Sequence, residues 1–427
     1  MKAAFYTLGC KVNQYETQLM LESLKEAGFE IVSHSEKADV YVVNSCTVTA
    51  MSNAKTRQAL HSFKKNNPES IVILAGCMSQ AYKDDAQRVE QADIIIGNTE
   101  HKILPEIIEK FLKENKRYID VCPHETGEAF ESGIIHSFDS KTRAIVKIED
   151  GCNRFCSYCA IPYARGRVRS KPLEVIEKEV GALADAGYKE VVLVGINLSA
   201  YSDGDNDIAD AVHTACKNGK IKRVRLGSLE PDHINNNIIF KLNKEEKFCP
   251  QFHISLQSGC DSTLKRMNRH YTTAEYKELC DKLRNTFKDC SLTTDIMVGF
   301  PGESEEEFEE SFSFARKIHF EKIHTFPYSV REGTAAARMK EQLPKKTKSE
   351  RAKKMIALAA EMRSEYFSRQ KGKKYEVLFE RKKGEYNLGH TKNYIPVKLK
   401  CDKDLQDEIL NVILTDSDGE YCEGELI

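Results

Sequence analysis

The sequence carries almost no net charge and no long apolar run. Its 64 Lys and Arg residues nearly balance 65 Asp and Glu residues, for a formal net charge of −1. The chain as a whole therefore does not indicate a nucleic-acid partner, and any basic surface must be local. No apolar run approaches membrane-spanning length, and Met1–Tyr6 runs into an apolar strand without the pattern of a signal peptide. We expect a cytoplasmic protein with no membrane partner.

Length and cysteine content narrow the possibilities further. A chain of 427 residues is too long for one compact core, so two or three domains are expected. The chain has 14 cysteines, but a reducing compartment disfavours a disulfide framework. Metal binding or catalysis better explains cysteines that stand in motifs, whereas solitary cysteines are more often small buried hydrophobes.

The most distinctive stretch is Cys152-x-x-x-Cys156-x-x-Cys159, which follows a short apolar strand. Thiolates are soft ligands that suit iron–sulfur clusters and zinc. Structural and electron-transfer sites usually have four protein ligands, and this motif supplies three. Either a distant cysteine completes the set, with Cys260 the nearest candidate, or one metal position is open for a substrate.

Residues 1–135 alternate strands with helices, which predicts a doubly wound parallel sheet. Cys10, Cys46 and Cys77 each lie just past a predicted strand. The carboxyl ends of parallel strands are the edge where open α/β sheets build ligand sites, so these three cysteines can converge there. The alternative is three unrelated structural cysteines.

Residues 136–365 contain six further strands of the βα type and a connecting helix. Six strands fall short of the eight of a closed barrel and predict an open (β/α)6 partial barrel, with its chemistry at the carboxyl ends of the strands. Polar residues gather at those ends and could line a pocket, although a structural role is the alternative for each: Asn197, Arg225, Ser228, Glu230, His253, Gln257, Asp295, Tyr328, Ser329 and Arg331.

Two basic segments are candidates for contact with a phosphate backbone. The first carries Arg165, Arg167, Arg169 and Lys171 directly after the cysteine motif; a solvated loop is the alternative. The second, residues 338–383, has 16 Lys and Arg against 6 Asp and Glu. It includes a predicted helix, Thr347–Gln370, that should dock through an apolar stripe: Ala352, Met355, Ile356, Ala359, Met362 and Tyr366.

Residues 366–427 contain short strands separated by turn signals, which predict a small β-barrel. Residues 401–427 hold nine Asp and Glu and one Lys, so only one side of this barrel should be basic. A basic, aromatic barrel surface of this kind often binds RNA, whereas a solvated charged face is the alternative.

These features together resemble a known family. The Cys152–Cys159 motif resembles the radical S-adenosylmethionine signature. With the preceding three-cysteine α/β domain and the trailing barrel, a module called TRAM, nearly the whole chain resembles the methylthiotransferases. Three stretches are most similar to the tRNA threonylcarbamoyladenosine methylthiotransferases: Leu8–Glu16, Thr294–Gly302 and Gly389–Tyr394.

The resemblance implies two [4Fe–4S] clusters and a tRNA substrate. Cys152, Cys156 and Cys159 would hold one cluster, whose open iron binds the amino and carboxylate groups of S-adenosylmethionine. Cys10, Cys46 and Cys77 would hold an auxiliary cluster that carries the sulfur. One S-adenosylmethionine would methylate that sulfur, and a second would yield a 5′-deoxyadenosyl radical that removes hydrogen from carbon 2 of the modified adenosine. A low-potential donor of the flavodoxin or ferredoxin type would supply electrons.

Two stretches depart from the family pattern, and other functions stay open. Val194-Gly195-Ile196-Asn197 stands where related enzymes have a Gly-Gly-Glu motif for the methionyl amine, so no residue receives that role. His253–Gln257 has serine where proline is common. Catalytic residues beyond the cysteines are not assigned. The alternatives are a methylthiotransferase for isopentenyladenosine in tRNA or for a ribosomal protein, and a non-catalytic, metal-bearing RNA-binding protein.

Overall fold

The computed structural model describes residues 1–47, 50–99, 101–131, 133–138 and 142–427. Its first part is a parallel sheet of six strands in the order β2-β1-β3-β4-β5-β6, which confirms the predicted doubly wound sheet. The strands are β1 (Lys2–Thr7), β2 (Glu30–Val32), β3 (Val40–Ser45), β4 (Ile71–Gly76), β5 (Ile94–Ile96) and β6 (Tyr118–Asp120). The edge strands β2 and β6 were not predicted, because each has only three residues and none of them is buried.

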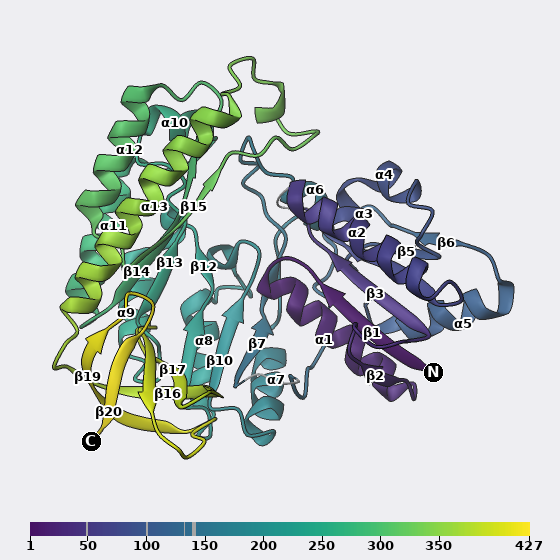
Figure 1. Ribbon diagram of the computed structural model, residues 1–427, viewed down its shortest axis with the longest axis horizontal. Helices are drawn as coiled ribbons and strands as arrows, with labels where there is room; N and C mark the ends of the chain where they lie inside the picture. Colours follow the sequence, from purple (N-terminus) through teal and green to yellow (C-terminus); the bar gives the residue numbers. More distant parts are fainter. Residues whose placement is uncertain (48–49, 100, 132, 139–141) are drawn as a thin grey trace.

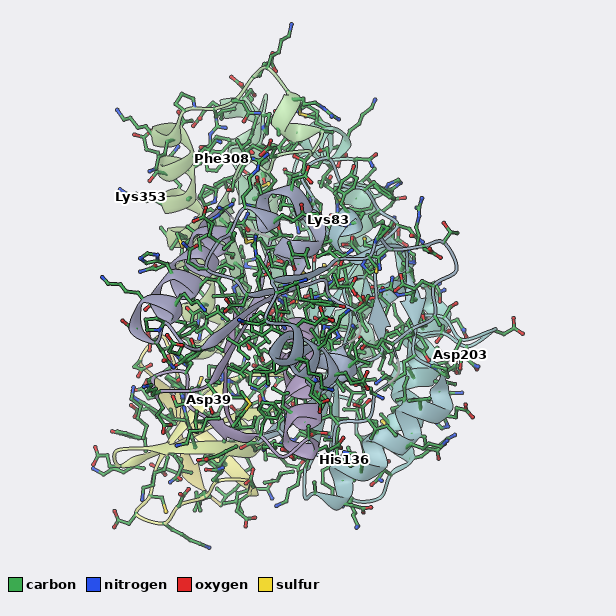
Figure 2. All side chains as sticks on the ribbon, turned by 90° about the vertical axis from the view of Figure 1, so that its right-hand side faces the viewer. Asp39, Lys83, His136, Asp203, Phe308 and Lys353 are labelled. Atoms are coloured by element: carbon green, nitrogen blue, oxygen red, sulfur yellow. The ribbon has the colours of Figure 1, made fainter. Side chains whose placement is uncertain are left out.

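Helices cover both faces of this sheet, as its fully buried central strands β3 and β4 require. The helices are α1 (Lys11–Glu26), α2 (Ala50–Asn66), α3 (Cys77–Ala81), α4 (Lys83–Gln87) and α5 (Leu104–Glu114). One apolar cluster joins the sheet to α1 and α5, and a second joins it to α2 and α4. In Figure 2 the labelled Asp39 and Lys83 mark the amino and carboxyl edges of this sheet.

The central part is an open, curved set of parallel strands, as predicted. Its strands form two sheets, β7-β10-β11 and β12-β13-β14-β15, and only Gly227 separates β11 from β12. The strands are β7 (Arg143–Lys147), β10 (Glu190–Val194), β11 (Arg223–Leu226), β12 (Ser228–Leu229), β13 (Gln251–Ile254), β14 (Ser291–Val298) and β15 (Lys322–Pro327). The main helices between them are α7 (Leu173–Asp185), α8 (Ile208–Lys217), α9 (Asn236–Asn243), α11 (Thr273–Thr286) and α12 (Glu305–Ile318).

A long helix, α13 (Lys345–Ser368), leads to the last part of the chain. It packs on β15 and α12. The prediction that Ile356 belongs to the buried stripe is wrong. Ile356 is 54% exposed, and Leu358 is buried instead. The buried positions Ala352, Met355, Leu358 and Met362 are three or four residues apart and share one side of the helix, which Ile356 does not. None of the described helices is long and apolar enough to cross a membrane.

The chain ends in a closed barrel of five strands in the order β16-β17-β18-β20-β19, which confirms the predicted small barrel. The strands are β16 (Lys374–Lys383), β17 (Tyr386–Thr391), β18 (Pro396–Lys400), β19 (Ile409–Ser417) and β20 (Cys422–Leu426). Figure 1 shows this barrel, in yellow, at the lower end of the central strands.

Arg225 joins the barrel to the central part, although we expected it to line the pocket. Its guanidinium pairs with Glu190 at 2.9 Å, donates to the Lys392 carbonyl at 3.0 Å and lies 4.6 Å from the centre of the Tyr394 ring. Arg223 points the same way, because residues two apart on a strand share a face, and it donates to the His390 carbonyl at 3.0 Å. The barrel therefore packs near the amino ends of the central strands.

Removal of this guanidinium should destabilise the protein. Arg225→Met removes the 2.9 Å partner of the buried Glu190 and leaves Arg223 at 3.9 Å, and loss of one partner of a buried ion pair costs about 3–5 kcal/mol. We expect that loss in urea-induced unfolding followed by circular dichroism. The control is Lys220→Met, which removes an exposed pair with Asp185 and should cost less than about 1 kcal/mol. Equal effects of the two substitutions would contradict this account.

Candidate functional site

Three cysteines of the N-terminal sheet meet at its carboxyl edge. Cys46 directly follows β3, Cys77 is the first residue of α3 after β4, and Cys10 directly precedes α1. Asn13, in the first turn of α1, lies between them, because its Oδ1 is 3.6 Å from the Cys10 Sγ and 3.9 Å from the Cys77 Sγ. The structure thus brings together the trio that the strand pattern placed at one edge.

Gly9 allows two of these cysteines to approach. Its φ is +106°, and a Cβ at this position would lie 2.8 Å from the Cys46 Cβ and 3.0 Å from the Cys46 Sγ. A side chain there would be strained and would clash with Cys46. Cys46 and Cys77 are buried whereas Cys10 is exposed, so the trio is accessible from the side of Cys10.

A guanidinium from the central part of the chain reaches this trio. Arg165, the last residue of the short helix α6 (Ile161–Arg165), is fully buried, and its Nε lies 3.2 Å from the Cys77 Sγ. A second guanidinium nitrogen donates to the Asn13 Oδ1 at 2.8 Å. Burial raises the pKa of Cys77 to about 12, although the Arg165 charge opposes that rise.

Glu16 anchors Arg165 within a buried ionic network. The Glu16 carboxylate accepts two hydrogen bonds from Arg165, one of them at 2.9 Å, and pairs with Lys147 at 2.8 Å. Lys147 also pairs with Asp150 at 2.7 Å. Burial alone would raise the pKa of Glu16, but the Arg165 and Lys147 charges lower it. The network therefore connects α1 to β7 and α6 through fully ionised groups.

Most of the first predicted phosphate-binding segment is used in such pairs. Arg165 and Lys171 are fully buried, and Lys171 pairs with Glu179 on α7. The Arg169 side chain is nearly buried and lies 3.4 Å from Asp150. The hypothesis that this segment faces a phosphate backbone is therefore wrong for three of its four cations. Arg167 alone among them is exposed.

The second trio lies in a loop at the carboxyl end of β7. The Cys159 N–H donates to the Cys156 carbonyl at 2.9 Å, which closes a tight turn between the two residues. Burial raises the pKa of Cys152 and of Cys159 to about 12, and the neighbouring Cys156 contributes to both shifts. Cys260, the candidate for a fourth ligand, instead lies 3.2 Å from the Ser262 Oγ, and no contact with the trio is seen among the described residues.

A second buried arginine contacts this trio. The Arg269 Nη1 lies 3.4 Å from the Cys156 Sγ, and its guanidinium is paired with Glu230, a predicted pocket residue. Arg154, within the cysteine loop, pairs with Asp232, which like Glu230 lies in the segment after β12. Each trio thus has one buried arginine at a cysteine sulfur, and a glutamate holds that arginine in place.

Fourteen buried side-chain nitrogen or oxygen atoms have no hydrogen-bond partner among the described residues, and three of them lie near the carboxyl ends of central strands. They are the Glu149 Oε1, the Asn197 Oδ1 and the Gln257 Oε1, which follow β7, β10 and β13. Buried polar atoms are nearly always satisfied, so an unpaired group of this kind points to a bound polar ligand. In the described part of the chain no three His, Cys, Asp or Glu side chains are placed to hold a single metal ion. The three cysteine sulfurs and these acceptors have the chemistry that a larger iron–sulfur cluster with a polar cofactor requires.

Glu149 was not among the predicted pocket residues. Its other oxygen accepts the Asn197 N–H at 2.7 Å, and burial raises the pKa of Glu149 well above its usual range. Gly195 makes room for it, since a Cβ there would lie 2.5 Å from the Glu149 Oε2. The sequence could have indicated Glu149, because it is an acidic residue directly after a predicted strand of the central part, and ligand sites form at this edge of a parallel sheet.

Other predicted pocket residues lie either on the central strands or at the boundary with the N-terminal part. His253 Nε2 lies 3.3 Å from the Asp295 Oδ2 on the neighbouring strand. Arg331 crosses to the N-terminal part and donates to the Thr47 hydroxyl at 2.8 Å, one residue beyond Cys46. Arg331 and Arg165 therefore both reach from the central part to the first trio.

The short helix α6 sets the distance between the two trios. It begins two residues after Cys159, and its last residue contacts Cys77. Five residues at a rise of ~1.5 Å each, plus one arginine side chain, reach at most on the order of 15 Å, so α6 keeps the two trios near each other. Figure 1 shows α6 at the upper end of the N-terminal part, on the side that faces the central part.

The chain is similar to known proteins over nearly its whole length. Residues 146–315 match the model of the radical SAM superfamily, and residues 2–97 match the uncharacterized protein family UPF0004. The threonylcarbamoyladenosine tRNA methylthiotransferase MtaB of Bacillus subtilis (strain 168) is 35% identical over 99% of this chain and 96% of its own length. The chain belongs to the radical S-adenosylmethionine methylthiotransferase family. The family recognised from the sequence is thus confirmed.

Further relatives cover the same length. MtaB of Aquifex aeolicus (strain VF5) is 38% identical over 93% of this chain and 96% of its own. A tRNA-2-methylthio-N(6)-dimethylallyladenosine synthase of Caldicellulosiruptor saccharolyticus is 33% identical over 99% and 91%. The solved radical S-adenosylmethionine methyltransferase TsrM of Kitasatospora setae has a TM-score of 0.60 at 13% identity, over 79% of this chain and 74% of that one, a likeness of fold alone. As a family member, the protein is a methylthiotransferase that uses S-adenosylmethionine and a [4Fe–4S] cluster.

The contact between Glu16 and Arg165 should show strong energetic coupling. In the apoprotein, Arg165→Met and Glu16→Gln should each lower the free energy of unfolding by about 3–5 kcal/mol, because each leaves a buried charge or polar group without its partner. The double variant should lose about 1–3 kcal/mol less than the sum of the two. Urea unfolding of the four proteins measures the coupling, and additive losses would show that the pair does not act as a unit.

Proposed function

We propose that the protein converts threonylcarbamoyladenosine next to the tRNA anticodon to its 2-methylthio derivative, with two S-adenosylmethionine molecules per turnover. The observation that carries this proposal is the pair of cysteine trios joined by α6, which begins two residues after Cys159 and ends at a residue that contacts Cys77. Two clusters joined by so short a helix suit one nucleoside placed between them. The full-length similarity to proteins named MtaB supports the choice of nucleoside.

In this proposal the two trios have separate roles. Cys152, Cys156 and Cys159 hold the cluster that binds S-adenosylmethionine, and Cys10, Cys46 and Cys77 hold a second, auxiliary [4Fe–4S] cluster. When bound, these groups supply the methyl group, the sulfur and the 5′-deoxyadenosyl radical that removes hydrogen from carbon 2 of the adenosine. An aromatic C–H offers no acidity to a side-chain base, so the difficult step belongs to the cofactors.

The protein's own residues bind and position the reactants. The unpaired acceptors of Glu149, Asn197 and Gln257 can accept hydrogen bonds from the amine of S-adenosylmethionine. Arg269 and Arg165 place positive charge at the Cys156 and Cys77 sulfurs, where thiolate ligands add negative charge. Hydrogen bonds and charge at cluster sulfurs tune the reduction potential.

The proposed domains are residues 1–135 with the auxiliary cluster, 136–365 with the partial barrel and connecting helix, and 366–427 as a TRAM module. Lys374, Arg381 and Lys383 on β16 are exposed, which gives this module a basic surface for tRNA. Because the module packs near the amino ends of the central strands, it suits the anticodon stem, while the anticodon loop reaches the cysteines.

A flavodoxin- or ferredoxin-type protein in the cytoplasm donates the electrons.

Cluster content tests the roles of the trios. Anaerobic reconstitution should give about eight iron and eight sulfide per chain, as two [4Fe–4S] clusters require. Cys10→Ala should roughly halve both values, whereas Cys216→Ala, at a buried cysteine of α8 away from both trios, should leave them unchanged. A well-reconstituted protein with a single cluster would contradict the proposal.

The same preparation separates the other functions. Reduction with dithionite in the presence of S-adenosylmethionine should release 5′-deoxyadenosine, which a non-catalytic RNA-binding protein would not produce. The relative named as a dimethylallyladenosine synthase, at 33% identity, keeps isopentenyladenosine as the second candidate substrate. Methylthiolation of tRNA that carries isopentenyladenosine, with none on threonylcarbamoyladenosine, would favour that candidate.

A further inference from the structure

An exposed phenylalanine lies between two of the cysteines. Phe155 is 39% exposed, and its backbone has φ of +50°, in the left-handed region. A bulky residue rarely adopts this conformation. Such backbone outliers persist only where the surroundings enforce them, and they cluster at active sites and ligand clamps.

Contacts around Phe155 hold this conformation in place. The Asn268 side-chain amide donates to the Arg154 carbonyl at 3.3 Å and to the Phe155 carbonyl at 3.1 Å. Asn268 is itself left-handed, with φ of +58°. The adjacent Arg154 is fixed by its ion pair with Asp232. The loop is thus clamped on its backbone, while the Phe155 ring stays exposed.

Two further side chains complete an exposed cluster, which we call the aromatic platform: Phe155, Tyr163 and Arg167. Tyr163 is 59% exposed and meets the Phe155 ring edge to face, with 6.1 Å between ring centres. The Arg167 guanidinium lies 5.0 Å from the Phe155 ring centre. No ion pair with a carboxylate is seen for Arg167 within the described part of the chain, in contrast to the three cations beside it.

Aromatic rings beside an arginine suit an unpaired nucleotide. Bases stack on aromatic side chains and on guanidinium planes whatever their sequence, and arginine pairs with the adjoining phosphate. Two rings and one cation make too small a patch for a stable protein–protein interface, which buries ~800 Å² on each partner. The platform also belongs to the segment that carries Cys152–Cys159, so a nucleotide bound there has its neighbours near the site.

We propose that the aromatic platform binds the unpaired anticodon-loop nucleotide next to the modified adenosine. The base stacks on Phe155 and Tyr163, and its phosphate pairs with Arg167. This inference rests on the proposed tRNA substrate and adds a second contact, at the opposite ends of the central strands from the TRAM module. The platform holds the loop so that the adenosine enters between the trios.

The absence of tryptophan from the chain allows a direct test. In the reconstituted protein, Phe155→Trp places a single tryptophan on the platform, and stacking of a base should quench its fluorescence when an anticodon stem-loop binds. Phe155→Ala should weaken binding about tenfold, as expected for loss of one base–aromatic stack. Arg167→Gln should reduce the dependence of log K on log salt by about one phosphate contact, ~0.7–0.9.

Phe240 provides the matched control. This α9 residue is also 59% exposed, and the Lys244 ammonium lies 4.0 Å from its ring centre, so it too is an aromatic–cation pair. Phe240→Trp should show no quenching, and Phe240→Ala should bind the stem-loop as the unaltered protein does. Iron content and circular dichroism of each variant verify that the fold and clusters are intact.

The outcomes separate this inference from the proposed function. Stem-loop binding detected by anisotropy, with no quenching in the Phe155→Trp variant or with equal quenching in both tryptophan variants, would overturn the platform and leave the proposed function in place. Failure of the unaltered protein to bind any tRNA stem-loop would overturn both. Quenching confined to the Phe155→Trp variant, together with weaker binding of Phe155→Ala, supports the platform.

Discussion

The pairing of Glu16 with Arg165 is the contact on which the arrangement of the molecule depends. Glu16 belongs to α1 of the N-terminal part, and Arg165 ends the helix that follows Cys152, Cys156 and Cys159. The same guanidinium contacts Asn13 and Cys77. Arg165 therefore links the N-terminal and central parts at the first cysteine trio, and Lys147, which also pairs with Glu16, strengthens this link. Arg331, through Thr47, adds a second tie beside Cys46.

Charge burial on this scale is stable only as a network. An isolated ion within the protein would cost several kcal/mol, whereas ions that share partners and hydrogen bonds offset that cost. Glu16, Lys147, Asp150 and Arg165 share partners in this way. The cations of the cysteine segment are divided between two environments, since Arg165, Arg169 and Lys171 form ion pairs with carboxylates and Arg167 is exposed. The parallel strands have the second cysteine trio at their carboxyl ends and the C-terminal barrel near their amino ends.

Sequence patterns predicted the elements better than the partners of individual side chains. Buried strands such as β3 and β4 were found because a parallel sheet needs continuous apolar runs, and the Cys10, Cys46 and Cys77 trio followed from strand polarity. The short edge strands β2 and β6 carry too few apolar residues for such a signal. Arg165 is buried because it pairs with Glu16, more than a hundred residues away, and Lys171 is buried because it pairs with Glu179 on α7. A local count of charges shows neither partner, so it suggested a solvated or phosphate-binding segment. Arg225 was misplaced for the same reason.

The identity of the modified nucleoside is the most direct test of the whole account. Nucleosides from the tRNA of a strain that lacks this gene should contain threonylcarbamoyladenosine without its 2-methylthio derivative, as measured by liquid chromatography and mass spectrometry. Expression of the intact gene should restore the derivative, and expression of a Cys152→Ala variant should not. Normal levels of 2-methylthio-threonylcarbamoyladenosine in the deletion strain, in the absence of a second enzyme of this type, would contradict the account.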